Sequence, residues 1–133
     1  MKFSYKKQIL EQHLDTFGHV NNAVYLELYE EARWDFITKA GFGLKEVQEA
    51  QIGPVILDIT ITYKAELKNR ENIIIESEYT GMKNSLVMTV CQKMIKGDGT
   101  LASDISISMG IFNMKTRKLI KPPVDWLNAL GAE

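Results

Sequence analysis

The chain has 133 residues, of which 45% are hydrophobic and 25% are charged, and this composition is typical of one soluble globular domain with a single core. Its 16 Lys and Arg residues against 17 Asp and Glu residues leave a formal net charge of -1, which gives no overall attraction to nucleic acid or an anionic membrane. The single cysteine, Cys91, excludes an internal disulfide, and no Cys/His cluster has zinc-site spacing. We therefore expect one domain over residues 1–133, with no metal and no nucleic-acid partner.

The N-terminal segment carries charged residues that interrupt each apolar run before it reaches the length of a signal peptide. Elsewhere, the apolar runs are far shorter than the roughly 20 residues that cross a bilayer. Together with the lone cysteine, this pattern predicts a cytoplasmic protein without a membrane span.

The first third of the chain predicts a short strand, a loop and a long helix. Residues 3–11 alternate only in part, as a short or edge strand does. Residues 15–22 are rich in turn formers and predict a loop in which Asn21 or Asn22 caps the next helix. Residues 23–39 have apolar side chains at helical spacing, and Gly41 can supply a left-handed stop. The face expected to be buried consists of Tyr25, Leu28, Tyr29, Ala32 and Phe36.

The rest of the chain predicts a short helical segment at residues 43–51 and then a series of strands. After Pro54 the apolar period changes to two, which predicts a strand at residues 55–63 with one buried face. Three further strands are expected, at residues 71–80, 85–95 and 101–113. Short links at residues 68–70, 81–84 and 97–99 favour antiparallel hairpins. Pro122 and Pro123 end the sheet, and a short helix around Trp126, Leu127 and Leu130 follows.

The order of elements predicts an α+β fold in which a five-stranded antiparallel sheet wraps around one long helix. A single helix cannot cover a sheet of this width, and long edge strands invite pairing with another chain. We therefore expect a homodimer.

The densest polar cluster, Asp15, His19, Asn21 and Asn22, comes directly before the long helix. These residues can simply cap the helix, whose first N–H groups lack partners and carry partial positive charge. The same N–H groups can instead bind a carbonyl oxygen and stabilise the oxyanion that forms when the carbonyl is attacked. Asp15 would then attack the carbonyl or activate water. Because an aspartate is a weak base at neutral pH, an activated electrophile such as a thioester suits it best.

Residues 15–33, with Asp15, Gly18-His19-Val20-Asn21-Asn22 and Tyr25, resemble the pattern D-x-x-G-H-V-N-N-x-x-Y, which is followed by a tyrosine, a glutamate and an arginine, here Tyr29, Glu31 and Arg33. This pattern belongs to hotdog-fold acyl-CoA thioesterases of the 4-hydroxybenzoyl-CoA thioesterase-like family, in the H-V-N-N branch. The predicted order of helix and strands is also that of the hotdog fold. The resemblance implies hydrolysis of an acyl-CoA thioester to free acid and CoA without a cofactor, at a site shared by two protomers of a homodimer or homotetramer.

The resemblance also implies roles for single residues. Asp15 is the expected catalytic carboxylate, and the Asn22 N–H is expected to polarise the thioester carbonyl with help from Ala23. Tyr25 matches a tyrosine that lines the acyl site, although a tyrosine on the buried face of a helix is as often a core residue. His19 is expected to orient the site or transfer a proton, or else to hold the loop by a hydrogen bond.

Two departures from related patterns affect these roles. The Tol-Pal-associated branch has a histidine where this chain has Asn22, and plant acyl-carrier-protein thioesterases have an asparagine where this chain has Phe17. Any catalytic help from that asparagine is therefore absent. We expect Glu31 and Arg33 to have structural or interface roles.

The phosphates of CoA require positive charge, for which Arg70 and Lys83 in predicted turns are the main candidates, beside Arg117 and Lys118. A cation in a turn is more often simply solvated. No phosphate-binding or dinucleotide-binding glycine motif is present, and neither is the H-P-x-F-P-G segment of hotdog dehydratases. Two alternatives stay open, a non-catalytic hotdog module that binds acyl-CoA or a partner, and an acyl-carrier-protein thioesterase.

Overall fold

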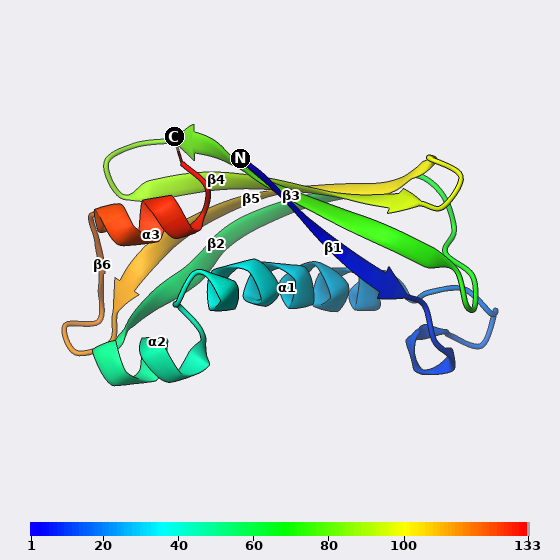
Figure 1. Ribbon diagram of the computed structural model, residues 1–133, viewed down its shortest axis with the longest axis horizontal. Helices are drawn as coiled ribbons and strands as arrows, with labels where there is room; N and C mark the ends of the chain where they lie inside the picture. Colours follow the sequence, from blue (N-terminus) through cyan, green and yellow to red (C-terminus); the bar gives the residue numbers. More distant parts are fainter. Residues whose placement is uncertain (133) are drawn as a thin grey trace.

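The structure is a computed structural model that describes residues 1–132 (Figure 1). It contains six strands, three α-helices and one short 3-10 helix. In chain order these are β1 (Lys2–Gln8), η1 (Glu11–His13), α1 (Asn22–Lys39), α2 (Leu44–Ala50), β2 (Ile52–Tyr63), β3 (Asn72–Met82), β4 (Val87–Lys96), β5 (Leu101–Asn113), β6 (Lys118–Ile120) and α3 (Val124–Ala129).

The strands form one antiparallel sheet in the order β1-β3-β4-β5-β2, with the short β6 paired to β5. Figure 1 shows this sheet curving over α1, which lies along its concave side. The predicted α+β hotdog fold, with a five-stranded sheet around one long helix, is confirmed, and β6 is a sixth strand that the sequence pattern did not reveal. Three residues are too few to show an alternating period.

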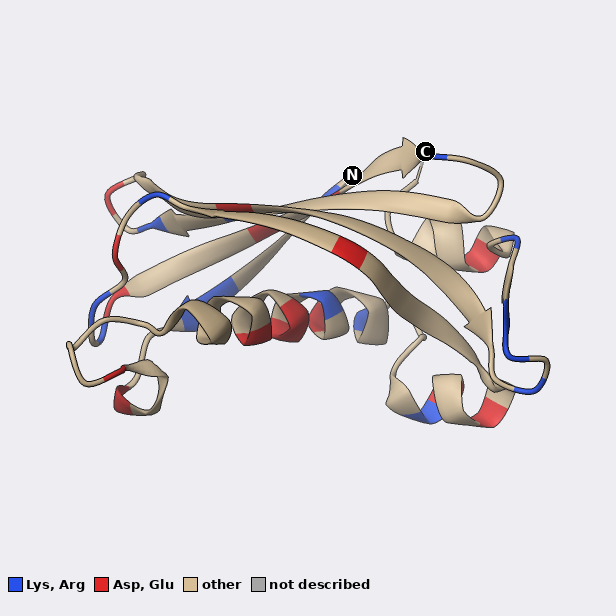
Figure 2. Cartoon of the chain, turned by 180° about the vertical axis from the view of Figure 1, so that it is seen from behind, with Lys and Arg blue, Asp and Glu red and all other residues tan. Residues whose placement is uncertain are grey.

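Helix α1 begins and ends close to the predicted residues. Asn21 is its N-cap, and the Asn21 Oδ1 accepts a hydrogen bond of 3.0 Å from the Ala23 N–H. After the helix, Gly41 has a φ of +92°, the left-handed conformation expected of a glycine stop. The predicted buried face is confirmed, and Ile37 joins it. Figure 2 shows that α1 carries several acidic residues, of which Glu27, Glu30 and Glu31 are exposed.

The hydrophobic core lies between α1 and the concave face of the sheet. The fully covered strand residues include Ile75, Met88 and Ile107, which are 0% exposed, and they pack in the same cluster as Tyr29 of α1. Trp126 of α3 closes one end of this core against Phe42, with ring centroids 4.4 Å apart. The predicted terminal helix is therefore part of the core.

Two expectations about β2 are wrong. The strand does not form a hairpin with β3; it pairs antiparallel with β5 and lies at the edge of the sheet. Its alternating pattern also fails to produce one buried face, since residues 56–60 are all exposed. Helix α1 is too narrow to cover this edge of the sheet. The sequence of β2 therefore still alternates between apolar and polar residues, but its apolar side chains remain exposed to solvent.

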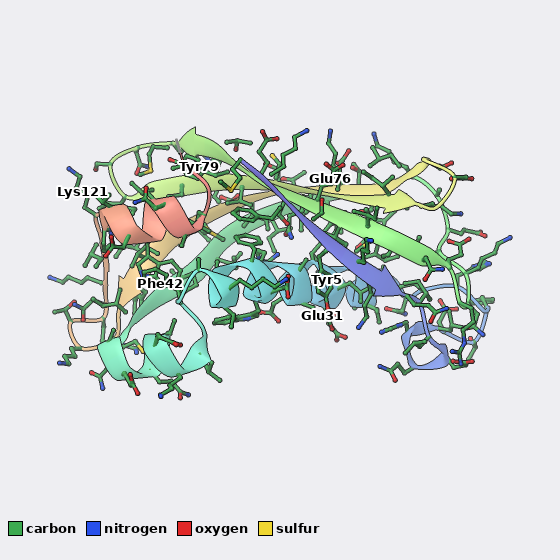
Figure 3. All side chains as sticks on the ribbon, viewed as in Figure 1. Tyr5, Glu31, Phe42, Glu76, Tyr79 and Lys121 are labelled. Carbon is green, nitrogen blue, oxygen red and sulfur yellow. The ribbon has the colours of Figure 1, made fainter. Side chains whose placement is uncertain are left out.

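The structure places Glu31 in a contact between α1 and β1 (Figure 3). The Tyr5 O–H donates a hydrogen bond of 2.6 Å to the Glu31 Oε2, and the Lys7 Nζ lies 2.9 Å from the same oxygen. The hydrogen bond to Glu31 raises the pKa of Tyr5 to about 12. Burial raises the pKa of Glu31, but the hydrogen bonds from Tyr5 and Lys7 outweigh it and hold that pKa below its usual value.

We expect Tyr5→Phe to lower the free energy of unfolding at pH 7 by about 0.5–1 kcal/mol, because a partly exposed, charge-assisted hydrogen bond is lost. The matched control is Tyr79→Phe, since the Tyr79 O–H has no hydrogen bond within residues 1–132. Glu31 has a lowered pKa in the folded state, so its contribution is present above about pH 4.3 and is lost as the pH falls further. Urea unfolding at pH 7 and pH 3 should therefore show the difference narrowing in acid, and a constant difference would contradict this account.

No helix in the described part of the chain is long and apolar enough to cross a membrane.

Candidate active site

A tight loop holds the Asp15 carboxylate just ahead of α1. The Asp15 N–H donates to the His19 carbonyl at 2.8 Å, and the Gly18 N–H donates to the Asp15 carbonyl at 3.1 Å. Gly18 has a φ of +80°, which this turn requires and which side-chain-bearing residues rarely adopt. The Asp15 Oδ1 accepts hydrogen bonds from the N–H groups of Phe17 at 2.9 Å and His19 at 3.4 Å. No described residue donates to Oδ2, so one carboxylate oxygen holds the loop and the other is available.

At the start of α1, the two N–H groups that the resemblance singled out differ in their hydrogen bonding. The Ala23 N–H is already bound to the Asn21 side chain, so it does not supply the expected help to a substrate carbonyl. Within residues 1–132, the Asn22 N–H has no acceptor. A helix N-terminus with an unpaired N–H attracts an oxygen that carries negative charge. The structure therefore leaves Asn22 as the free donor at this position.

Tyr25 and Tyr63 form the floor beside this helix terminus. The Tyr63 O–H donates to the Asn22 carbonyl at 2.9 Å, and the two rings meet edge to face with centroids 5.0 Å apart. The Tyr25 O–H donates to the Ala65 carbonyl at 3.3 Å, and only 4% of this residue is exposed. Burial raises the pKa of Tyr25, so it stays a neutral donor. Tyr25 is thus both a core residue and a residue that lines the site.

His19 lies against the segment that follows β2. Its Nε2 is 3.2 Å from the Glu66 Oε2, and its backbone forms a bridge with Lys68. The sequence pattern missed both Tyr63 and Glu66. Tyr63 looked like any alternating strand residue, and Glu66 lies 33 residues beyond Arg33, the end of the motif, so only the fold brings them to Asp15.

One open cleft contains these groups, and its lining combines polar and apolar side chains. Its lining residues are Asp15, His19, Val20, Asn22, Tyr25, Tyr63, Lys64, Ala65 and Glu66. Four of the residues singled out from the sequence, Asp15, His19, Asn22 and Tyr25, are thus brought together. Within residues 1–132, no group of three or more His, Cys, Asp or Glu side chains is placed to hold a metal ion.

The two cations expected to bind CoA phosphates are not placed together. Arg70 forms a two-pronged ion pair with Glu11, in which its Nη2 lies 2.7 Å and 2.9 Å from the two carboxylate oxygens. Its charge is therefore already partly neutralised. Lys83 lies in the turn between β3 and β4, and Figure 1 shows this turn at the opposite end of the molecule from the start of α1. Lys83 is thus remote from Asp15 within one chain.

The arrangement is suited to attack on a carbonyl group. A half-buried carboxylate with one free oxygen and an unpaired N–H at a helix start line the same cleft. The N–H can hold a carbonyl oxygen as it becomes negative, while the carboxylate attacks the carbonyl carbon or removes a proton from water. No tightly bound group is needed for either role.

Comparison with known proteins agrees with this chemistry. The chain is 30% identical over 110 residues to the long-chain acyl-CoA thioesterase FadM of Escherichia coli, a match that covers 81% of each chain. It is 25% identical over 123 residues to the acyl-CoA thioester hydrolase YbgC of Escherichia coli, covering 90% of each. The crystal structure of YbaW, a probable thioesterase of Escherichia coli, superposes with a TM-score of 0.83 at 25% identity, over 97% of this chain and 96% of that one. The model of the thioesterase-like superfamily matches residues 10–130, and the chain belongs to this superfamily.

Proposed function

We propose that this chain hydrolyses acyl-CoA thioesters to a free acid and CoA at the Asp15 cleft. The observation that carries the proposal is that the free Asp15 Oδ2 and the unpaired Asn22 N–H belong to residues that line the same cleft. The acyl-CoA substrates of the relatives FadM and YbgC support the choice of thioester.

In the proposed reaction, the thioester carbonyl oxygen accepts a hydrogen bond from the Asn22 N–H. Asp15 either removes a proton from the attacking water or attacks the carbonyl carbon itself, in which case water then hydrolyses the anhydride. The C–S bond breaks, and the CoA thiolate leaves and takes up a proton. His19, held by Glu66, is a positioning residue for the loop in this proposal.

We also propose that the working form is a homodimer joined through β2. One edge of this 12-residue strand pairs with β5, and its other edge has no partner within the described residues. Leu57, Ile59 and Tyr63 of this strand are 45%, 38% and 47% exposed. An antiparallel copy of the same strand would satisfy the open backbone groups and cover this apolar surface. Light scattering on the purified protein should give twice the mass of one chain, or four times if two such dimers associate.

The experiment that tests the function measures hydrolysis of acetyl-, medium-chain, long-chain and aromatic acyl-CoAs. The free acid is quantified directly, because dyes that detect the released thiol also react with Cys91. We expect turnover of at least one class. Tight binding of acyl-CoA without any turnover would replace this proposal with a binding module, and the absence of binding would point to a carrier-protein thioester instead.

A further inference from the structure

One of the two histidines of the chain, His13, is buried in the turn that leads into the Asp15 loop and has no part in the proposed reaction. It is the last residue of η1, and only 8% of it is exposed. Figure 1 shows this short helix at the end of the molecule where α1 begins. A buried imidazole is costly unless its ring nitrogens make hydrogen bonds.

The imidazole of His13 closes η1. The Leu10 N–H donates to the His13 Nδ1 at 2.8 Å, and the His13 N–H donates back to the Leu10 carbonyl at 2.9 Å. Leu10 precedes the 3-10 helix, so its N–H has no acceptor in the backbone of that helix. Because Nδ1 accepts from an N–H, it is unprotonated, and the ring carries its proton on Nε2. His13 is therefore neutral in this arrangement.

A short antiparallel neck connects this turn to the loop of the active site. The neck pairs residues 13–15 with residues 19–21. At its base, the Asn21 N–H donates to the His13 carbonyl at 3.4 Å. Asp15 lies at its far end, and its returning side leads into the N-cap of α1. The neck therefore sets the position of the carboxylate relative to the first N–H groups of the helix.

Protonation of His13 removes this support. An imidazolium carries a hydrogen on both ring nitrogens, so Nδ1 can no longer accept and instead faces the Leu10 N–H as a second donor. Two opposed donors, one of them an N–H without an acceptor, disfavour the closed turn. Histidine side chains ordinarily change charge near pH 6.5. We therefore expect the base of the neck to loosen as the pH falls through this range.

The charged groups on the elements around His13 offset this loss only in part. Glu31 of α1 interacts electrostatically with His13, but the Lys7 Nζ of β1 lies 2.9 Å from the Glu31 carboxylate. Glu11 of η1 is paired with Arg70 at 2.7 Å. Both carboxylates thus already have a cationic partner when His13 gains its charge. The other charged or titratable side chains on the adjoining segments are Asp15, Lys68, the pair of His19 and Glu66, and the pair of Glu71 and Lys96.

We propose that His13 is a positioning residue for Asp15 and Asn22, and that its neutral imidazole holds the neck in the form that hydrolyses thioesters. This inference rests on the proposed thioesterase function. His13 contacts neither the substrate nor the reacting atoms, and it acts only through the loop. It makes turnover fall as the pH is lowered from 7 to 5.

The first test replaces the imidazole by a side chain that accepts a hydrogen bond but does not titrate. The Oδ1 of asparagine can take the place of Nδ1, so His13→Asn should keep the bond from the Leu10 N–H at each pH. Between pH 7 and pH 5, we expect kcat for the best acyl-CoA to fall by about 10-fold in the native protein and by less than about 3-fold in His13→Asn. A merely structural role would leave the two pH profiles alike, and equal falls would overturn the proposal.

The matched control is His19→Gln, because His19 is the other histidine of the chain and its Nε2 is paired with Glu66. Its kcat should fall with pH as the native kcat does, and a flat profile would assign the effect to His19 instead. Carboxyl groups ordinarily titrate near pH 4, so a loss carried by a carboxylate appears separately at lower pH.

His13→Leu removes the acceptor altogether. We expect its kcat at pH 7 to be about 10-fold below the native value, with no further fall down to pH 5. Native turnover in a folded His13→Leu protein contradicts the assignment. If this variant does not fold, the pH profile of His13→Asn decides alone.

A measurement without substrate separates this inference from the proposed function. The protection of the Leu10 amide against hydrogen exchange, followed by NMR, should fall by about 10-fold between pH 7 and pH 5 in the native protein and stay constant in His13→Asn. Constant protection in the native protein overturns the role of His13, whether or not the protein is a thioesterase. A fall in protection without turnover of any acyl-CoA supports the hold of His13 on the neck and overturns only the hydrolysis.

Discussion

Asp15→Asn is expected to lower kcat/KM for the best acyl-CoA by about 10²–10⁴-fold. The substitution keeps an oxygen that can accept from the Phe17 and His19 N–H groups, so the loop should stay folded. It removes the negative charge that attacks the carbonyl or takes a proton from water. Because the loop geometry is kept, a loss of turnover would report on the chemistry rather than on folding.

Steady-state hydrolysis and thermal unfolding of the same samples test this expectation together. The matched control is Asp98→Asn, because the Asp98 Oδ1 likewise accepts a backbone N–H, that of Thr100 at 2.9 Å, in the turn between β4 and β5. The control should keep native turnover. Asp15→Ala adds the loss of the two loop hydrogen bonds and should also lower the unfolding temperature. Native turnover in Asp15→Asn would exclude Asp15 as nucleophile or base.

Gln92→Leu is expected to have the largest effect on stability, about 3 kcal/mol in the free energy of unfolding. Gln92 is 0% exposed, and its Nε2 donates to the Tyr29 carbonyl at 3.1 Å and to the Ser77 Oγ at 2.9 Å. Its Oε1 accepts from the Arg33 Nη1 at 2.9 Å. This amide therefore ties α1 to β3 and β4, and it accepts a hydrogen bond from a partly buried guanidinium that forms no ion pair within residues 1–132.

Arg33 explains why the loss should be large. Burial lowers the pKa of this arginine and outweighs the opposite effect of the nearby Glu30, so burial disfavours its charged form. Leucine at position 92 would remove its acceptor and leave the cation without a hydrogen bond from the protein. The double variant Arg33→Met/Gln92→Leu removes both groups and should regain part of the stability. Urea unfolding of the two single variants and the double variant measures this coupling, and additive effects would contradict the network.

Local sequence patterns were sufficient to predict the long helix, two of the hairpins and several residues of the candidate site. Helix α1 could be predicted because its capping residue, its buried face and its glycine stop are all encoded within residues 21–41. The hairpins β3–β4 and β4–β5 are confirmed for the same reason, since short turns fix the pairing of consecutive strands. The motif at residues 15–33 likewise identified Asp15, His19, Asn22 and Tyr25, which the structure brings to one cleft.

Contacts between distant parts of the chain were decided only by the tertiary structure. Alternation in β2 shows that it is a strand but does not specify its neighbour, and packing places it beside β5 at the edge of the sheet rather than beside β3. The same packing brings Tyr63 and Glu66 to the Asp15 loop and pairs Arg70 with Glu11. A period of two or 3.6 residues records which side of an element is apolar, whereas the choice of partner depends on how the whole sheet closes over α1.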